Sequence, residues 1–98
     1  MTSRALPRIR DLIRACWYEL TDHAQEEALE DDLHRVDIEA AILSGELRRV
    51  ERHKWGTRYL LIGVATDFTR KVGVVFQFNP GGRSGMIVIA YEIAEKEI

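Results

Sequence analysis

The chain has 98 residues, of which 46% are hydrophobic and 31% charged, and its formal net charge is −2. This length suits one domain, and the charge argues against strong non-specific nucleic-acid binding, which needs a clearly basic surface. The sequence has no run of about 18 apolar residues to span a membrane, and its charged start predicts no secretion signal. With a single cysteine, we expect a cytoplasmic protein without disulfides, metal or cofactor.

The first part of the chain has apolar side chains at the spacing of a helix. Residues 5–16 predict a first helix whose apolar stripe places Cys16 in the core (Leu6, Ile9, Ile13, Cys16 and Trp17). Residues 18–20 either extend this helix or form a short extended link, and we favour the link.

Two further helices follow. Thr21 or Asp22 caps a second helix that runs to about residue 32, with three apolar positions on its buried side (Ala24, Ala28 and Leu29). A third helix spans residues 36–44 with one apolar stripe (Ile38, Ala41 and Ile42). Gly45 is expected to end it in the left-handed conformation typical of glycine after a helix.

The second half of the chain changes to strand-like alternation. Four strands are predicted (46–53, 57–64, 71–78 and 86–91). Short connections indicate antiparallel pairing, and the last strand is apolar on both faces, which favours a central position. The sequence therefore predicts an α+β fold in which N-terminal helices pack on one face of a four-stranded antiparallel sheet.

His23 is the first candidate catalytic residue, because it stands in the first turn of the second helix. Free backbone N–H groups there favour anions and keep an imidazole neutral, as a general base requires. Arg58 could neutralise a phosphate and Tyr91 could donate a proton, as in a metal-independent ribonuclease. The alternative is a structural role in which His23 only caps the helix and packs on the sheet.

A metal site at the same helix is a weaker interpretation. His23 and Glu27 are four residues apart on one helical face, and His34 or Glu26 could join them. Zinc sites need three or four converging ligands, and the spacing places only two. A solvated acidic face explains the carboxylates equally well, so the prediction is that no metal binds.

Charge is unevenly distributed, with an acidic segment at residues 19–39 and a basic one at residues 48–58. The basic segment contains five candidate binding residues (Arg48, Arg49, Arg52, Lys54 and Trp55). Such a mixture can bind phosphates and stack on bases, or protect an edge strand from unwanted pairing. A third possibility is that it receives an acidic segment of a protein partner.

An ordered series of short motifs resembles the DUF4258 domain family over about residues 18–92. The motifs are Tyr18-x-Leu20-Thr21-x-His23-Ala24, Asp37-Ile38-x-x-Ala41-Ile42-x-x-Gly45-Glu46, Arg58-Tyr59-Leu60-x-x-Gly63, Val74-Val75 and Ile87-Val88-Ile89-x-Tyr91-Glu92. The resemblance implies one domain, in which residues 1–17 add an N-terminal helix, 18–92 form the family-like core and 93–98 form a tail.

That family is a bacterial domain of unknown function, usually grouped with the RelE/ParE-like toxins of toxin–antitoxin pairs. The resemblance implies the RelE/ParE-like fold and an RNA-cleaving or gyrase-directed ancestry. This chain departs from the family's pattern, because Glu27 and Asp31 replace basic residues, Asp32 replaces a glycine and Ile89 replaces a threonine.

The acidic replacements on the second helix favour a non-catalytic or degenerate protein-interaction domain. The alternative is a metal-independent ribonuclease toxin that uses His23, Arg58 and Tyr91. The expected partners are an antitoxin-like protein or RNA, not a membrane. A homodimer through the first helix is also possible and would decide whether Trp17 and Tyr18 lie in the core or in an interface.

Overall fold

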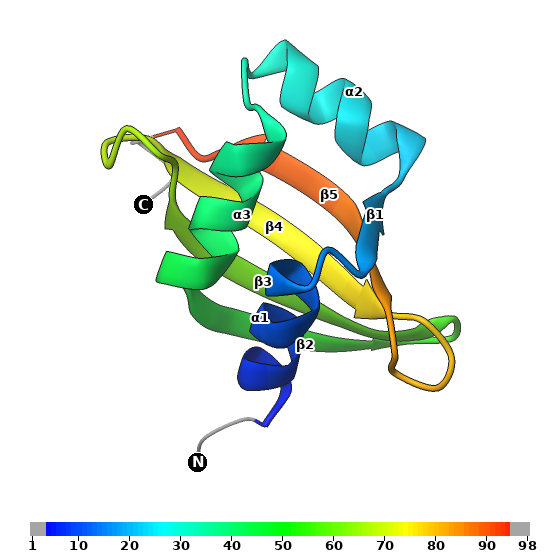
Figure 1. Ribbon diagram of the computed structural model, residues 1–98. Coiled ribbons are helices and arrows are strands. Elements are labelled where there is room, and N and C mark those ends of the chain that lie inside the picture. The colour runs from blue at the N-terminus through cyan, green and yellow to red at the C-terminus, as the bar shows by residue number, and fades with distance from the viewer. Residues whose placement is uncertain (1–3, 95–98) are drawn as a thin grey trace.

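Three helices lie on one side of a five-stranded sheet in the computed structural model, which describes residues 4–94 (Figure 1). The helices are α1 (Ala5–Arg14), α2 (Asp22–Glu30) and α3 (Arg35–Ser44). The strands are β1 (Tyr18–Leu20), β2 (Glu46–His53), β3 (Gly56–Val64), β4 (Lys71–Phe78) and β5 (Gly85–Glu92). α3 crosses β3 and β4, whereas α2 follows β5. Residues 95–98 of the expected tail lie outside the described residues.

The α+β class is confirmed, but the prediction of a four-stranded antiparallel sheet is wrong. The sheet is mixed, with the order β1-β5-β4-β3-β2. The expected link at residues 18–20 is β1, which pairs parallel to β5. The Gly85 N–H donates to the Trp17 carbonyl at 3.1 Å, and the Thr21 N–H donates to the Ile87 carbonyl at 3.0 Å. β5 is therefore central along its first half, as its apolar faces predicted.

The core lies between the helices and the sheet. α1 contributes Ile9, Leu12 and Ile13, and the sheet contributes residues that alternate along each strand (Leu61, Val72, Val74, Phe76 and Ile87). Tyr18 is also buried. Because the apolar face of α1 packs into its own domain, this burial of Tyr18 needs no second copy of the chain.

Both α1 and α2 end in a residue with positive φ that is not glycine, and this overturns the core assignment of Cys16. Cys16 has φ 61°, and the Trp17 N–H donates back to the Leu12 carbonyl at 2.9 Å, as in a Schellman motif. The chain therefore leaves the helical stripe, so that Cys16 and Trp17 are exposed. Asp32, with φ 54°, ends α2 in the same way.

Leu29 and Gly45 also differ from expectation. Leu29 is 79% exposed, because the narrow stripe of Ala24 and Ala28 is what α2 packs against the sheet. Gly45 has φ −89°, outside the left-handed region, and its need for glycine comes from a close approach. A Cβ at Gly45 would lie 2.4 Å from the carbonyl oxygen of Ala41.

Within residues 4–94, no helix combines the length and the apolar character that crossing a membrane requires.

The C-terminal end of α3 finds hydrogen-bond donors elsewhere in the domain. The Arg10 guanidinium donates to the Gly45 carbonyl at 2.7 Å and to the Ile42 carbonyl at 3.3 Å, which satisfies the C-terminal end of α3.

Candidate functional site

The sheet face opposite the helices, here called the open face, contains two of the three proposed catalytic residues. Arg58 on β3 and Tyr91 on β5 line one shallow cavity of about 220 Å³. Its other lining residues combine charge with apolar surface (Arg49, Glu51, Leu60, Val75 and Ile89). The cavity thus brings two guanidinium groups and a phenol together on an apolar floor.

Neighbouring residues hold Arg58 and Tyr91 in place. The Arg58 Nε donates to the Gln77 Oε1 at 3.1 Å, and the Gln77 amide donates to the Trp55 carbonyl at 2.8 Å. Gly73 makes room for Tyr91, because a Cβ there would lie 2.8 Å from the Tyr91 Cζ. Both side chains are only partly buried and line the cavity on the open face.

His23 does not line this cavity. It projects from the first turn of α2 with 65% of its side chain exposed, and its Nε2 lies 3.6 Å from the Glu27 Oε1. Among residues 4–94, no three histidine, cysteine, aspartate or glutamate side chains are grouped so that they could hold a metal ion. The imidazole thus lies outside the arginine–tyrosine cavity.

The five basic-segment residues do not share one surface, because β2 alternates between the two faces of the sheet. Arg49 pairs with Leu60 and points to the open face, whereas Arg52 pairs with Thr57 and points to the helix side. Arg48 falls in a β-bulge. Lys54 and Trp55 form the turn between β2 and β3, where the Lys54 ammonium lies 4.9 Å from the Trp55 ring centroid. β2 is nevertheless an edge strand of the sheet.

Two acidic residues that depart from the family's pattern, Glu27 of α2 and its C-cap residue Asp31, form hydrogen bonds with the edge of β5. β1 pairs only with the first residues of β5, and beyond them α2 lies alongside instead of a strand. The Glu27 Oε1 accepts the Ala90 N–H at 3.3 Å, and the Asp31 Oδ2 accepts the Glu92 N–H at 2.7 Å. These carboxylates take the place of strand carbonyls, which is a structural role that the sequence pattern did not indicate.

Thr21 caps α2, as predicted, and also forms a hydrogen bond with the edge of β5. Its Oγ1 accepts the Ala24 N–H at 3.1 Å and donates to the Val88 carbonyl at 3.2 Å. One hydroxyl therefore satisfies a free N–H at the start of the helix and a free carbonyl of β5.

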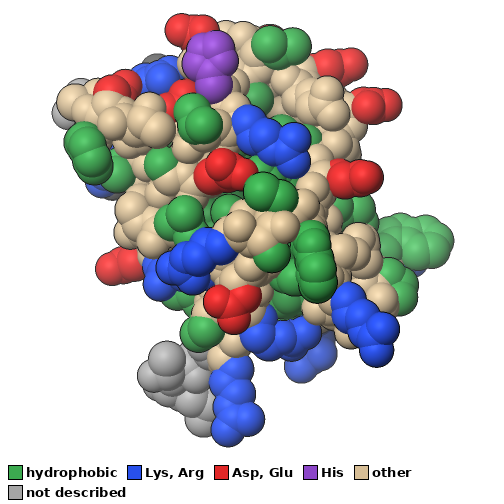
Figure 2. Space-filling model, in the orientation of Figure 1, with side chains coloured by type: hydrophobic (Ala, Val, Ile, Leu, Met, Phe, Trp, Pro, Cys, Tyr) green, Lys and Arg blue, Asp and Glu red, His purple; other side chains and the backbone are tan. Residues whose placement is uncertain are grey.

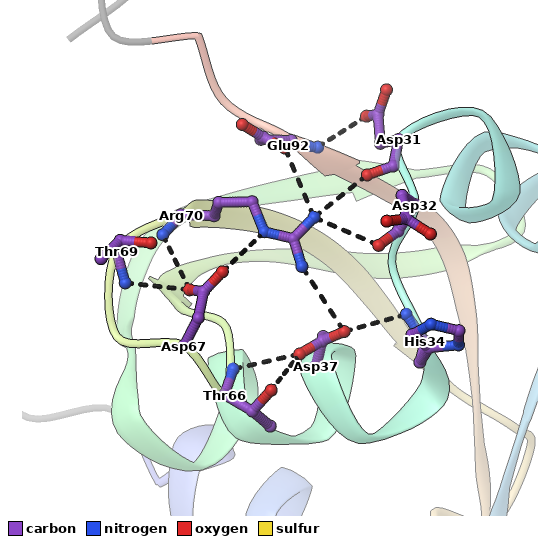
Figure 3. A network of polar contacts seen from close by, with 9 residues as sticks. All are labelled: Asp31, Asp32, His34, Asp37, Thr66, Asp67, Thr69, Arg70 and Glu92. Atoms are coloured by element: carbon purple, nitrogen blue, oxygen red, sulfur yellow. Dashed lines mark hydrogen bonds and ion pairs between the residues drawn. The ribbon is translucent and has the colours of Figure 1, made fainter.

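Arg70 is the centre of the densest polar network (Figure 3). Its guanidinium donates to the carbonyls of Asp31 and Asp32 at 3.2 and 3.1 Å, and to the Asp67 carboxylate at 2.9 Å. It also lies 3.7 Å from carboxylate oxygens of Asp37 and Glu92. Backbone N–H groups of the β3–β4 turn, donating to the Asp67 carboxylate, hold its pKa below the ordinary range.

Asp37 is the buried member of this network, with 2% of its surface exposed. Its carboxylate accepts the His34 N–H at 3.0 Å, the Thr66 N–H at 3.1 Å and the Thr66 hydroxyl at 2.5 Å. The Thr66 hydroxyl bond is the main cause that lowers the pKa of Asp37, against the opposing effect of burial. Since the charged form is satisfied within the domain, the network is structural and offers no free acid or base.

The fold and the site define a small α+β domain whose open sheet face carries basic and apolar side chains. The chain belongs to the DUF4258 family, a domain of unknown function, whose family model matches residues 20–92. Searches of curated proteins and of solved structures returned no significant match.

Replacing Asp37 with asparagine should destabilise the domain by about 1–3 kcal/mol, because an amide N–H₂ would face the donors of His34 or Thr66. The pKa of Asp37 is lowered from its ordinary value of 3.8, so its contribution is present above pH 3.8 and is lost as pH falls through the lowered folded-state pKa. Urea unfolding at several pH values should show the difference between wild type and Asp37→Asn shrinking only in acid. Asp11→Asn, an exposed control, should change stability little; equal losses for both variants would contradict the assignment.

Replacing Asp31 with alanine should expose the edge of β5, because the Glu92 N–H loses its acceptor. We expect its amide exchange to accelerate about fivefold or more, which corresponds to the loss of about 1 kcal/mol. Hydrogen-exchange NMR measures this directly. Glu30→Ala, at the exposed neighbouring position of α2, serves as the control, and unchanged exchange at Glu92 in Asp31→Ala would refute the edge role.

Proposed function

We propose that this chain is a non-catalytic protein-interaction domain that binds an acidic and apolar segment of a partner protein on its open face. The observation that carries the proposal is the apolar character of that face. Leu60, Val75 and Ile89 are only half-buried there, on the side of the sheet away from the three helices of residues 4–94 (Figure 1). Exposed apolar patches with a polar border are typical of interaction sites.

The charges at the border favour an acidic partner. Arg49 and Arg58 line the cavity from adjacent strands, against the single carboxylate of Glu51. Arg49 also pairs with Glu51 at 3.0 Å, but both side chains are more than 60% exposed, so this pair contributes little and an incoming carboxylate can replace it. Beside them, β2 is an exposed edge strand to which a partner's extended segment could add.

The resemblance to RelE/ParE-like toxins supports the same proposal, with an antitoxin-like protein as the partner. In this interpretation the chain keeps a toxin's scaffold without its chemistry, since His23 does not line the cavity that holds Arg58 and Tyr91. Glu27 and Asp31 are already bonded to the β5 edge and would repel a phosphate near His23.

A metal-independent ribonuclease toxin is the second candidate. One observation favours it: Arg58 and Tyr91 share a cavity in which a phosphate could meet both a cation and a proton donor. The two candidates differ in whether RNA is cut.

Charge reversal of two arginines on β2 tests the interaction surface. A photo-crosslinking residue at Leu60, in the organism of origin, identifies the partner segment, and calorimetry then measures its affinity. Arg49→Glu should weaken binding about tenfold or more, because Arg49 faces the cavity. Arg52→Glu is the matched control on the opposite side of the same strand and should leave affinity within about twofold. Equal effects of the two variants, or no effect of either, would reject the open face as the binding surface.

An RNA-cleavage assay separates the two candidates. We expect purified protein in excess EDTA to leave RNA intact, and its expression to leave growth unchanged. Metal-independent cleavage that falls about 100-fold or more in Arg58→Ala and Tyr91→Phe would establish the ribonuclease and overturn the interaction proposal. His23→Ala then shows whether the imidazole takes part.

A further inference from the structure

A second groove lies among the helices, between α2, α3 and the edge strand β1. Its volume is about 620 Å³, which makes it larger than the cavity on the open face. The apolar lining comes from all three elements and the link between the helices (Leu20, Ala28, Leu29, Leu33 and Ile38). Ala28, Leu33 and Ile38 form a buried floor, whereas Leu29 is 79% exposed at the rim.

The edge of β1 beside this groove is already closed to another strand. Tyr18 and Leu20 alternate with the positions that bond to β5, so their carbonyls point outward. The Arg35 guanidinium donates to the Tyr18 carbonyl at 3.4 Å, and the Gln25 amide donates to the Leu20 carbonyl at 3.2 Å. An added strand would have to displace both side chains, so the groove suits a helix rather than a strand.

Arg35 is the basic residue among those that line the groove, and it is internally engaged. Its Nε donates to the Tyr18 hydroxyl at 2.8 Å, its guanidinium lies 4.6 Å from the Tyr18 ring centroid, and the same hydroxyl donates to Glu39. Burial, followed by the bond to Glu39, raises the pKa of Tyr18 to about 12, so the phenol stays protonated at neutral pH. Arg35 keeps its positive charge, because the phenol to which it bonds is neutral, so the α3 side of the groove has one cationic side chain.

The α2 and β1 side of the groove is acidic. Two carboxylates line it there, Glu19 on β1 and Asp22 on α2, and α2 has no lysine or arginine. Figure 2 shows several acidic side chains along the upper margin of the molecule, with basic side chains among them and others over the lower part. A ligand with basic flanks would be attracted to this end of the domain.

We propose that the groove between α2 and α3 binds an amphipathic helix of a partner protein, with apolar anchors that contact Leu29 and flanking lysines or arginines that contact Glu19 and Asp22. A second copy of the chain does not supply such a helix from residues 4–94. Its basic helix is α1, whose apolar residues Ile9, Leu12 and Ile13 are buried in its own core. This surface is distinct from the open face and of opposite charge preference.

The test is a displayed library of short amphipathic helical peptides in which the positions flanking the apolar stripe are randomised. Selection on the full chain should enrich lysine and arginine at those positions. Chemical-shift changes on addition of a selected peptide should map to α2, α3 and β1. Affinity should fall about tenfold or more in Leu29→Ser and also fall in the double variant Glu19→Gln/Asp22→Asn, which removes the two carboxylates that line the groove.

Phe68→Ser is the matched control, because Phe68 is 83% exposed in the β3–β4 turn, away from the groove, and should leave affinity unchanged. No enrichment, enrichment of acidic flanks, or shifts that map elsewhere would overturn the proposal. Analytical ultracentrifugation of the wild type and of Leu29→Ser tests whether a second copy of the chain occupies the groove. Self-association of the wild type that is lost in Leu29→Ser would assign the groove to a second copy and also overturn it.

Discussion

The guanidinium of Arg70 joins four segments that are far apart in the sequence. It binds the carbonyls that end α2, the Asp67 carboxylate in the β3–β4 turn, the buried Asp37 at the start of α3, and Glu92 at the end of β5. These contacts hold the end of α2 beside β5 and the start of α3 beside the turn. The position of both helices relative to the sheet, and so the proposed groove between α2 and α3, depends on this network.

Structural contacts also account for Glu27 and Asp31, the two acidic residues at positions where the family resemblance implies basic ones. Asp31 receives the Glu92 N–H through its side chain and Arg70 through its carbonyl, and Glu27 receives the Ala90 N–H. Asp32 adopts the left-handed conformation that a glycine would adopt more easily, and Arg70 binds its carbonyl. α2 thus closes part of the β5 edge through the carboxylates of Glu27 and Asp31.

Much of this fold could be predicted from the sequence wherever an element is long enough to repeat its pattern. The cap at Thr21, the apolar stripe of α3 and the four longer strands all follow from local periodicity or local hydrogen bonding. β1 could not be predicted, because three residues show no alternation and only the distant β5 makes them a strand. The exposure of Cys16 depends on a positive φ that side-chain spacing does not reveal.

The candidate sites were predictable only in part, because they too depend on which distant segments the fold brings together. Arg58 and Tyr91 come together because β3 and β5 flank β4, an arrangement that follows from the sheet order. His23 does not join them, and strand alternation divides Arg49 from Arg52 although they are neighbours in the sequence. Residues that look like one basic segment therefore lie on two sides of the sheet, and of the five candidates Arg49 lines the open-face cavity.

Hydrogen exchange of the Arg70→Ala variant tests the central claim, that one guanidinium holds these segments together. The amides of His34, Thr66 and Glu92 each donate to a carboxylate of the network and lie in three different segments. We predict that all three lose protection by a similar factor, while the Ala24 amide, bonded to Thr21 at the other end of α2, keeps its own. Faster exchange at Thr66 alone, with His34 and Glu92 unchanged, would contradict the account.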